Sequence, residues 1–89
     1  MVERQIKVIN SLGVHARPAA KIVQAANQYK SVIKLISENG QADAKSILNV
    51  LMLGATCDTA ITISASGIDE IEAVDSIAAL FAQKFDEES

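Results

Sequence analysis

The sequence predicts an α+β fold, an open-faced two-layer sandwich in which three helices cover one face of a four-stranded antiparallel sheet in the order β-α-β-β-α-β-α. Segments in which apolar and polar residues alternate, as in half-buried strands, are separated by segments in which apolar residues recur every three or four positions, as in helices. Two β-α-β halves flank a hairpin signal, which favours a sheet with helices on one face. The 89 residues suit a single domain, expected to span residues 1–89.

A strand and a helix open the chain. Residues 2–9 alternate, with Ile6 and Val8 on one face, and predict the first strand. Residues 16–28 then change to helical spacing, and their small apolar side chains would let this helix lie close to the sheet. The apolar stripe of the helix is expected to contain Ala16, Ala19, Ala20, Val23 and Ala26.

A hairpin follows the first helix. Residues 31–37 alternate again and predict the second strand. Asn39-Gly40 is a strong turn signal because both residues tolerate positive φ. A short strand over residues 41–44 is therefore expected to pair back antiparallel to the second.

The next segment carries signals for both ends of a helix. Ser46 is a good N-cap residue, and Gly54 can adopt the left-handed conformation that closes a helix. Together they predict a short helix over residues 47–53. Residues 59–66 are rich in β-branched side chains and predict the last strand, which Gly67 ends.

The last helix is expected to begin at Asp69, which with Glu72 resembles a capping box. Its first turn is acidic and Lys84 lies near its end, and these charges suit the helix macrodipole. Apolar residues at intervals of three and four predict one buried face, made of Ile71, Val74, Ile77, Phe81 and Phe85.

The composition excludes several classes of function. With 8 basic and 11 acidic residues, the net charge of −3 argues against a basic face that grips nucleic acid. Aromatic residues make up only 3% of the chain, so base-stacking platforms are not expected. One cysteine, Cys57, and one histidine, His15, cannot build a zinc site, a haem attachment or a disulfide framework. We therefore expect no metal and no cofactor.

The sequence also bears on location. The first residues lack an apolar signal region, and no apolar run approaches the ~20 residues of a membrane span. A single unpaired cysteine suits a reducing compartment. We expect a cytoplasmic protein without membrane insertion, and a monomer by default.

The segment before the first helix is the most informative. Gly13 permits a sharp turn, and Pro18 falls in the first helical turn, where its missing N–H costs little. These two residues place His15 at the N-cap of the helix. Histidine caps helices poorly compared with serine or asparagine, so its presence there calls for another role.

Chemistry supplies such a role. The main-chain N–H groups of Ala16 and Arg17 lie at the positive end of the helix and form a ready site for an anion. The same helix end disfavours a positively charged ring, so the imidazole of His15 is expected to be neutral and nucleophilic. His15 is thus predicted to accept and carry a phosphoryl group, and Arg17 to donate charge-assisted hydrogen bonds to its oxygens.

A simpler interpretation competes with this one. A lone histidine in a loop is more often a solvated residue than a catalytic one, and Arg17 also fits the polar stripe of the helix. The combination of Gly13, His15, Arg17 and Pro18 in one short segment favours the functional interpretation.

The segment Leu12-Gly13-Val14-His15-Ala16-Arg17-Pro18-Ala19 closely resembles the active-site motif of HPr, the histidine-containing phosphocarrier family of the bacterial phosphoenolpyruvate-dependent sugar phosphotransferase system. The resemblance continues through residues 44–47 and 60–67 and covers essentially the whole chain. It implies a single HPr domain whose histidine, His15, is phosphorylated on Nδ1 by enzyme I, itself charged from phosphoenolpyruvate. The phosphoryl group would then pass to a sugar-specific enzyme IIA.

Ser46 is explained by N-capping, and the resemblance adds a second role. In HPr proteins of bacteria that have an HPr kinase/phosphorylase, the matching serine is phosphorylated from ATP. This phosphoserine lowers transfer through the histidine and can recruit a transcription factor. The match Lys45-Ser46-Ile47 implies the same catabolite regulation here wherever such a kinase is present. A phosphate at this helix N-terminus should be tolerated by the fold.

The short helix is too apolar to bury all its side chains. Val50 and Leu53, three residues apart, can point inward together, which leaves the others as a docking patch. Deeper packing of the whole helix into the core is the alternative. The residues expected to dock partners are Ile47, Leu48, Leu51 and Met52, together with Lys21 and Lys45.

Other features concern the branch and class of function. Gln24 and Asn27 stand where many HPr proteins have lysine, and Leu51-Met52-Leu53 resembles the nitrogen-related branch, whose carrier (NPr) serves a regulatory relay. An NPr-like phosphocarrier is therefore one alternative, and an interaction module controlled through Ser46 is another. A small hydrolase lacks support, because one histidine and one arginine offer little to activate water.

Overall fold

The computed structural model describes residues 1–86 of the chain. It contains four strands, three helices and a short 3₁₀ turn, η1, within that range. In chain order these are β1 (Val2–Lys7), α1 (Ala16–Ala26), β2 (Val32–Ser37), β3 (Gly40–Asp43), α2 (Ile47–Leu53), β4 (Ala60–Ser66), α3 (Glu70–Ala82) and η1 (Lys84–Asp86).

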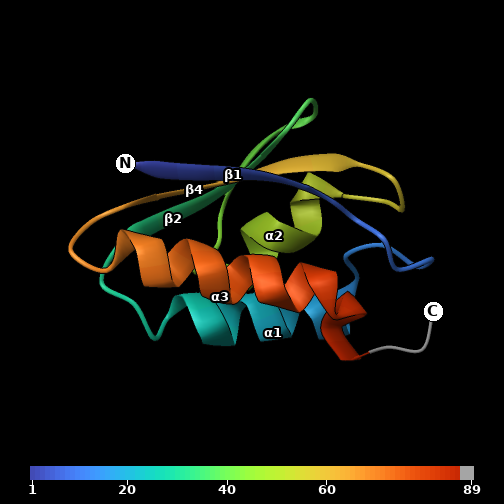
Figure 1. Ribbon diagram of the computed structural model, residues 1–89. Helices are drawn as coiled ribbons and strands as arrows, with labels where there is room; N and C mark the ends of the chain where they lie inside the picture. The colour runs from blue at the N-terminus through green and yellow to red at the C-terminus, as the bar shows by residue number, and fades with distance from the viewer. Residues whose placement is uncertain (87–89) are drawn as a thin grey trace.

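The four strands form one antiparallel sheet in the order β1-β4-β2-β3. Figure 1 shows the three helices gathered on one side of this sheet, while its other side is open. The last strand in sequence, β4, lies between β1 and β2, so the first strand of the chain pairs with the last and forms one edge of the sheet. The predicted fold class and element order are confirmed.

The core lies between the sheet and the helices. On the two central strands, alternate residues are buried and their neighbours are more exposed, as a sheet covered on one side requires. Leu35 and Ile63 are direct partners across β2 and β4 and are both almost fully buried. They pack with Ile33, Ile61, Ile22, Val50, Val74 and Ile77.

The buried face of α1 differs from the predicted stripe. Ile22 is fully buried, although the prediction left it out, and Ala16 is exposed. The reason is positional: Ala16 is the first helical residue, at the end of the helix, whereas Ala19, Ile22 and Ala26 follow one another at intervals of three and four along the inner face.

The start of α3 also departs from expectation. Asp69 is the N-cap residue, but its side chain makes no capping hydrogen bond. Its carboxylate instead accepts hydrogen bonds from the N–H of Lys30, at 2.8 Å, and from the N–H and Oγ of Ser31, at 2.9 and 2.5 Å. The predicted capping box is therefore wrong. Asp69 fastens α3 to the loop before β2.

The buried face of α3 is mostly as predicted, with one exception. Val74, Ile77 and Phe81 are buried, but Ile71 is 60% exposed. Ile71 lies in the first turn, on the side facing away from the sheet, and Ala73 takes the inward position there.

The end of α3 turns back into the core. Helical geometry stops at Ala82, and Lys84 and Phe85 adopt left-handed conformations with φ of 53° and 55°. Phe85 is nevertheless fully buried, with its ring edge-on to that of Phe81 and the ring centres 4.9 Å apart. The predicted burial of Phe85 is confirmed, but a reversal of the chain achieves it rather than a longer helix.

Candidate phosphoryl-acceptor site

His15 is the N-cap residue of α1. Its backbone is extended, with φ −102° and ψ −162°, and its side chain makes no hydrogen bond that caps the helix. Its carbonyl oxygen accepts the first helical hydrogen bond, from the N–H of Ala19 at 2.9 Å. The main chain thus places the half-buried His15 at the helix end.

The first turn of α1 provides the setting for an anion beside His15. Ala16, Arg17 and Pro18 are its first three residues, and in any α-helix the N–H groups at these positions lack carbonyl partners within the helix. Pro18 contributes no N–H and is buried, so it fits this turn without loss of a hydrogen bond. Ala16 and Arg17 are exposed, where a phosphoryl group could approach them.

The loop that carries His15 is seated on the segment after α2. Gly13 has a φ of +69°, and a Cβ atom there would lie 2.6 Å from the carbonyl oxygen of Ala55 and 2.9 Å from Cα of Thr56. The N–H of Val14 donates to the same Ala55 oxygen at 2.9 Å. Only glycine permits this close approach. The sequence indicated a turn at Gly13 but gave no signal for Ala55, because the two segments meet only in the folded chain.

Ser46 is the N-cap of α2, as predicted. Its Oγ accepts hydrogen bonds from the main-chain N–H of Asn49, at 3.3 Å, and from Nδ2 of the same residue, at 3.1 Å. Gly54 closes the helix in the left-handed conformation, with φ 64° and ψ 33°. The half-buried Ser46 hydroxyl therefore has a clear structural role.

The outer face of α2 is apolar. Val50 and Leu53 point into the core, which confirms the predicted inward pair. The four residues predicted to form a docking patch are all exposed, with Leu48 at 63% and Met52 at 75%. Leu12, in the loop before His15, is also an exposed apolar residue, and its exposure was not predicted.

The two lysines expected to dock partners make hydrogen bonds within the molecule. The Nζ of Lys21 donates to the carbonyl oxygen of Phe85 at 2.6 Å, and that of Lys45 donates to the carbonyl oxygen of Tyr29 at 2.7 Å. Lys21 thus joins α1 to the segment after α3. Both ammonium groups hold main-chain carbonyls near the ends of helices, whatever further part they take in docking.

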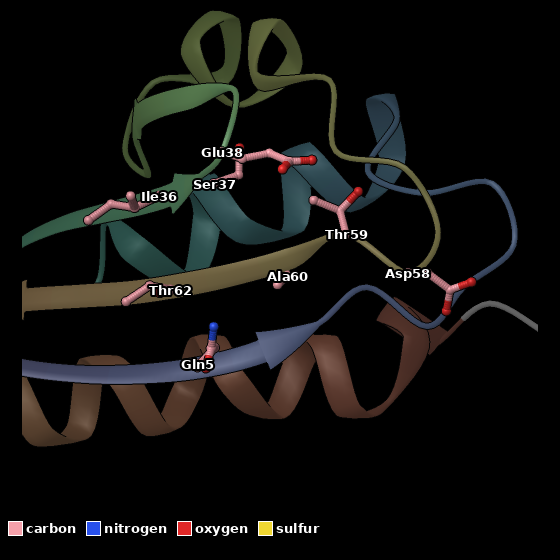
Figure 2. Close-up of a pocket in the computed structure, with 8 residues that line it drawn as sticks. All are labelled: Gln5, Ile36, Ser37, Glu38, Asp58, Thr59, Ala60 and Thr62. Carbon is pink, nitrogen blue, oxygen red and sulfur yellow. The ribbon is translucent and has the colours of Figure 1, made fainter.

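The site is an exposed surface rather than a cleft. A hollow of about 470 Å³ lies elsewhere, and no residue predicted to act in the site lines it. Figure 2 draws its lining residues, which come from β1, β2, β4 and the adjoining loops. In residues 1–86, no group of three or more His, Cys, Asp or Glu side chains is arranged to hold a metal ion. The hollow is lined by Gln5, Ile36, Ser37, Glu38, Asp58, Thr59, Ala60 and Thr62.

No helix within the described residues is long and apolar enough to cross a membrane.

The family is decided by a match to the family model described as the PTS HPr component phosphorylation site, which covers residues 2–83. The chain belongs to the HPr family. This match includes the His15 motif, Ser46 and α2.

Relatives from both branches of the HPr family resemble the chain. It is 43% identical to the phosphocarrier protein HPr of Treponema pallidum over 88 residues, which is 99% of this chain and 100% of the relative. It is also 43% identical to the phosphocarrier protein NPr of Proteus mirabilis over 86 residues, 96% of each chain. The chain is thus a phosphocarrier-family protein of HPr or NPr type.

Solved HPr structures share the fold. The HPr of Thermoanaerobacter tengcongensis has a TM-score of 0.95 and 39% identity, and the similarity covers 100% of both chains. The catabolite repression protein Crh of Bacillus subtilis has a TM-score of 0.75 and 36% identity, covering 94% of this chain and 97% of Crh, and is described as a dimer with a swapped domain.

Proposed function

We propose that this protein is a phosphocarrier that accepts a phosphoryl group on Nδ1 of His15 from charged enzyme I and passes it to a sugar-specific enzyme IIA. The observation that carries the proposal is the position of His15, the N-cap residue of α1, directly before the exposed Ala16 and Arg17. A phosphoryl group on the ring of a residue at this place would lie beside the first-turn N–H groups, which favour an anion. Membership of the HPr family supports the same reaction.

The proposed reaction is an in-line phosphoryl transfer. Nδ1 of His15 attacks the phosphorus of the donor, so that a P–N bond forms while the bond from phosphorus to the donor breaks. The N–H groups of Ala16 and Arg17 and the guanidinium of Arg17 then stabilise the charge on the phosphoryl oxygens. In the second step a nucleophile of the acceptor attacks the phosphorus, and the P–N bond breaks with His15 as the leaving group. The same N–H groups and guanidinium stabilise the phosphoryl oxygens in this step.

The exposed site suits a protein that is itself a substrate of larger enzymes. A small carrier can dock first on its donor and then on its acceptor through one surface, with transient interfaces at the low end of the usual range of area. We assign this surface to Ala16, Arg17 and the exposed face of α2. The docking residues proposed on α2 are Ile47, Leu48, Leu51 and Met52.

Intact-mass measurement tests the carrier role. The protein is incubated with phosphoenolpyruvate and an enzyme I whose activity is shown on its own HPr, alongside a His15→Ala variant. We expect one acid-labile phosphoryl group on the wild-type protein and none on the variant. No phosphorylation of the wild type, or equal phosphorylation of both, would overturn the assignment of His15.

A nitrogen-branch carrier is the second candidate. The similarity to the Proteus mirabilis NPr and the run Leu51-Met52-Leu53 favour it. Comparing the initial phosphorylation rates with enzyme I proteins of the sugar and nitrogen branches separates the two. A higher kcat/KM with the nitrogen-branch donor would assign the chain to that branch.

We also propose that Ser46 is a regulatory phosphorylation site. A phosphate on its Oγ would add negative charge at the start of α2, beside the docking surface, and so weaken transfer through His15. An HPr kinase/phosphorylase and a transcription factor would be the partners of that form. Incubation with such a kinase and ATP should add an acid-stable phosphate that is absent from Ser46→Ala.

The expected cytoplasmic location and monomeric state are part of the proposal. Because Crh is described as a domain-swapped dimer, the oligomeric state needs its own measurement. Sedimentation equilibrium should give a mass of one chain. A stable dimer would overturn the expected monomeric state.

A further inference from the structure

Asn10 is a buried polar residue in the loop that leads to His15. Its exposed fraction is zero, although it lies beyond the end of β1, where the flanking residues Ile9 and Ser11 are exposed. A fully buried amide is expensive unless its hydrogen bonds are satisfied. The contacts of Asn10 therefore indicate what it does.

Asn10 and Gly13 are the first and last residues of a tight turn, and two hydrogen bonds join them. The main-chain oxygen of Asn10 accepts from the N–H of Gly13 at 3.0 Å, and its Nδ2 donates to the carbonyl oxygen of Gly13 at 2.6 Å. The first bond is the i to i+3 bond of a β-turn, with asparagine and glycine at positions where each is favoured. The second bond, from the side chain, fixes the orientation of the next peptide.

That next peptide joins Gly13 to Val14. In a trans peptide the C=O and the following N–H point in opposite directions, and the described chain contains no cis peptide. Asn10 holds the oxygen at one edge of this peptide, while the oxygen of Ala55 accepts from the N–H of Val14 at the other edge, at 2.9 Å. The peptide is pinned from both sides, one residue before His15.

We propose that Asn10 is a positioning residue for phosphoryl transfer, acting through the peptide between Gly13 and Val14 to set where His15 enters the N-terminus of α1. Without the Nδ2 donor, that peptide can rotate away from Ala55, and His15 moves relative to the first-turn N–H groups. The inference rests on the proposed carrier function and adds a residue that never touches the phosphoryl group.

The test compares Asn10→Leu, which is close to isosteric and removes the donor, with Ser31→Ala. Ser31 is also a buried polar residue with a side-chain hydrogen bond, to Asp69, but it lies in the loop at the other end of α1. Steady-state phosphorylation by charged enzyme I is measured on both variants at a temperature where each is folded.

For Asn10→Leu we expect kcat to fall by about tenfold or more, because a displacement of about 1 Å at a reacting atom can reduce rates about 100-fold. The KM for enzyme I should stay within about twofold, since the docking side chains of α2 are unchanged. Ser31→Ala should keep both parameters near wild type despite lower stability. Wild-type kcat in Asn10→Leu, or equal losses in the two variants, would overturn the proposal.

Nuclear magnetic resonance gives a readout that needs neither turnover nor a variant. In the wild-type protein, the side-chain amide protons of Asn10 should exchange with solvent far more slowly than those of the exposed Asn39. Equally fast exchange would contradict a lasting hydrogen bond from Nδ2 of Asn10 to the Gly13 oxygen, even if Asn10→Leu failed to fold. If the wild type is not phosphorylated at all, the proposed carrier function is wrong. Slow exchange at Asn10 would still support the hydrogen bond between Asn10 and Gly13.

Discussion

The N–H of Val14 and the carbonyl oxygen of Ala55 form a hydrogen bond of 2.9 Å that joins the loop before α1 to the segment after α2. Val14 directly precedes His15, and Ala55 directly follows Gly54, the C-cap of α2. This main-chain contact therefore places the His15 loop beside the C-terminal end of the apolar helix α2. Any change that breaks this contact should affect transfer as well as stability.

Replacing Gly13 by alanine should disrupt this contact. The new Cβ would lie 2.6 Å from the oxygen of Ala55, and the residue would also keep an unfavourable φ of +69°. We expect a loss of unfolding free energy larger than the ~1–2 kcal/mol that a left-handed conformation alone costs a non-glycine residue. Urea denaturation measures the stability, and phosphorylation by enzyme I measures transfer.

Gly54→Ala is the matched control for that change. Gly54 has a similar φ of +64°, but a Cβ atom there would lie 3.9 Å from its nearest neighbour, the carbonyl oxygen of Met52, so only the conformational cost applies. Gly54→Ala should lose only the ~1–2 kcal/mol of the left-handed conformation and keep its transfer rate. If the two variants lost stability equally, the close approach to Ala55 would be unimportant.

Leu48→Glu should impair docking. Leu48 is 63% exposed on α2, so a charge at this position stays in contact with solvent in the isolated fold. If partners bury this side chain, kcat/KM for phosphorylation by enzyme I should fall by at least about tenfold, equivalent to about 1.4 kcal/mol. Stability should change little.

Ile68→Glu serves as the control for Leu48→Glu. Ile68 is 88% exposed in the loop between β4 and α3, at the end of the molecule away from the His15 loop (Figure 1). It should leave transfer unchanged. An unchanged kcat/KM in Leu48→Glu would contradict the proposal that partners dock on the exposed face of α2. Equal losses in both variants would indicate a general effect of the added charge.

Ser46→Ala should lower the free energy of unfolding by about 1 kcal/mol, the usual loss when an N-cap hydroxyl is removed. In a domain of this size that corresponds to a Tm lower by about 4–8 °C. Ser46→Asp should retain the cap and most of the stability, while its negative charge slows transfer from enzyme I. Calorimetry and phosphorylation rates check the two variants. A slow but stable Ser46→Asp supports regulation, and a normal rate contradicts it.

Local signals predicted the elements that depend on local interactions. Ser46 and Gly54 define the ends of α2 through contacts within a few residues, so their types alone located that helix. The same holds for His15, whose place at the start of α1 followed from Gly13 and Pro18. Strand alternation predicted the sheet because one face of each strand must meet the helices.

Contacts between distant segments were not predictable in the same way. Asp69 looked like a capping residue, but Ser31 and Lys30, brought beside it by the fold, offer three better donors. Ile22 is buried on the inner face of α1, whereas Ala16 is exposed at the end of the helix. The Asn10 and Ala55 contacts that hold the His15 loop likewise exist only once the loops are packed together.

Acid should weaken the contact between Asp69 and Ser31. The Ser31 hydroxyl, followed by the main-chain N–H of Lys30, lowers the pKa of the Asp69 carboxyl below its ordinary value of 3.8. A lowered pKa in the folded state means that the contribution to stability is fully present above about pH 4, where the carboxyl is ionised in the unfolded chain too. It is lost as the pH falls through the lowered folded pKa.

Asp69→Asn isolates this contribution. The variant should be less stable than wild type at neutral pH, because an amide has one neutral acceptor oxygen where the carboxylate has two charged ones, so that its NH2 group faces one of the three donors. The difference should shrink as the pH falls from about 4 towards 2. Urea unfolding across that range measures it. Glu72→Gln, a change at an exposed acid in the first turn of the same helix, controls for net charge. A difference between wild type and Asp69→Asn that stayed constant with pH would mean that the Asp69 charge does not fasten α3 to the loop before β2.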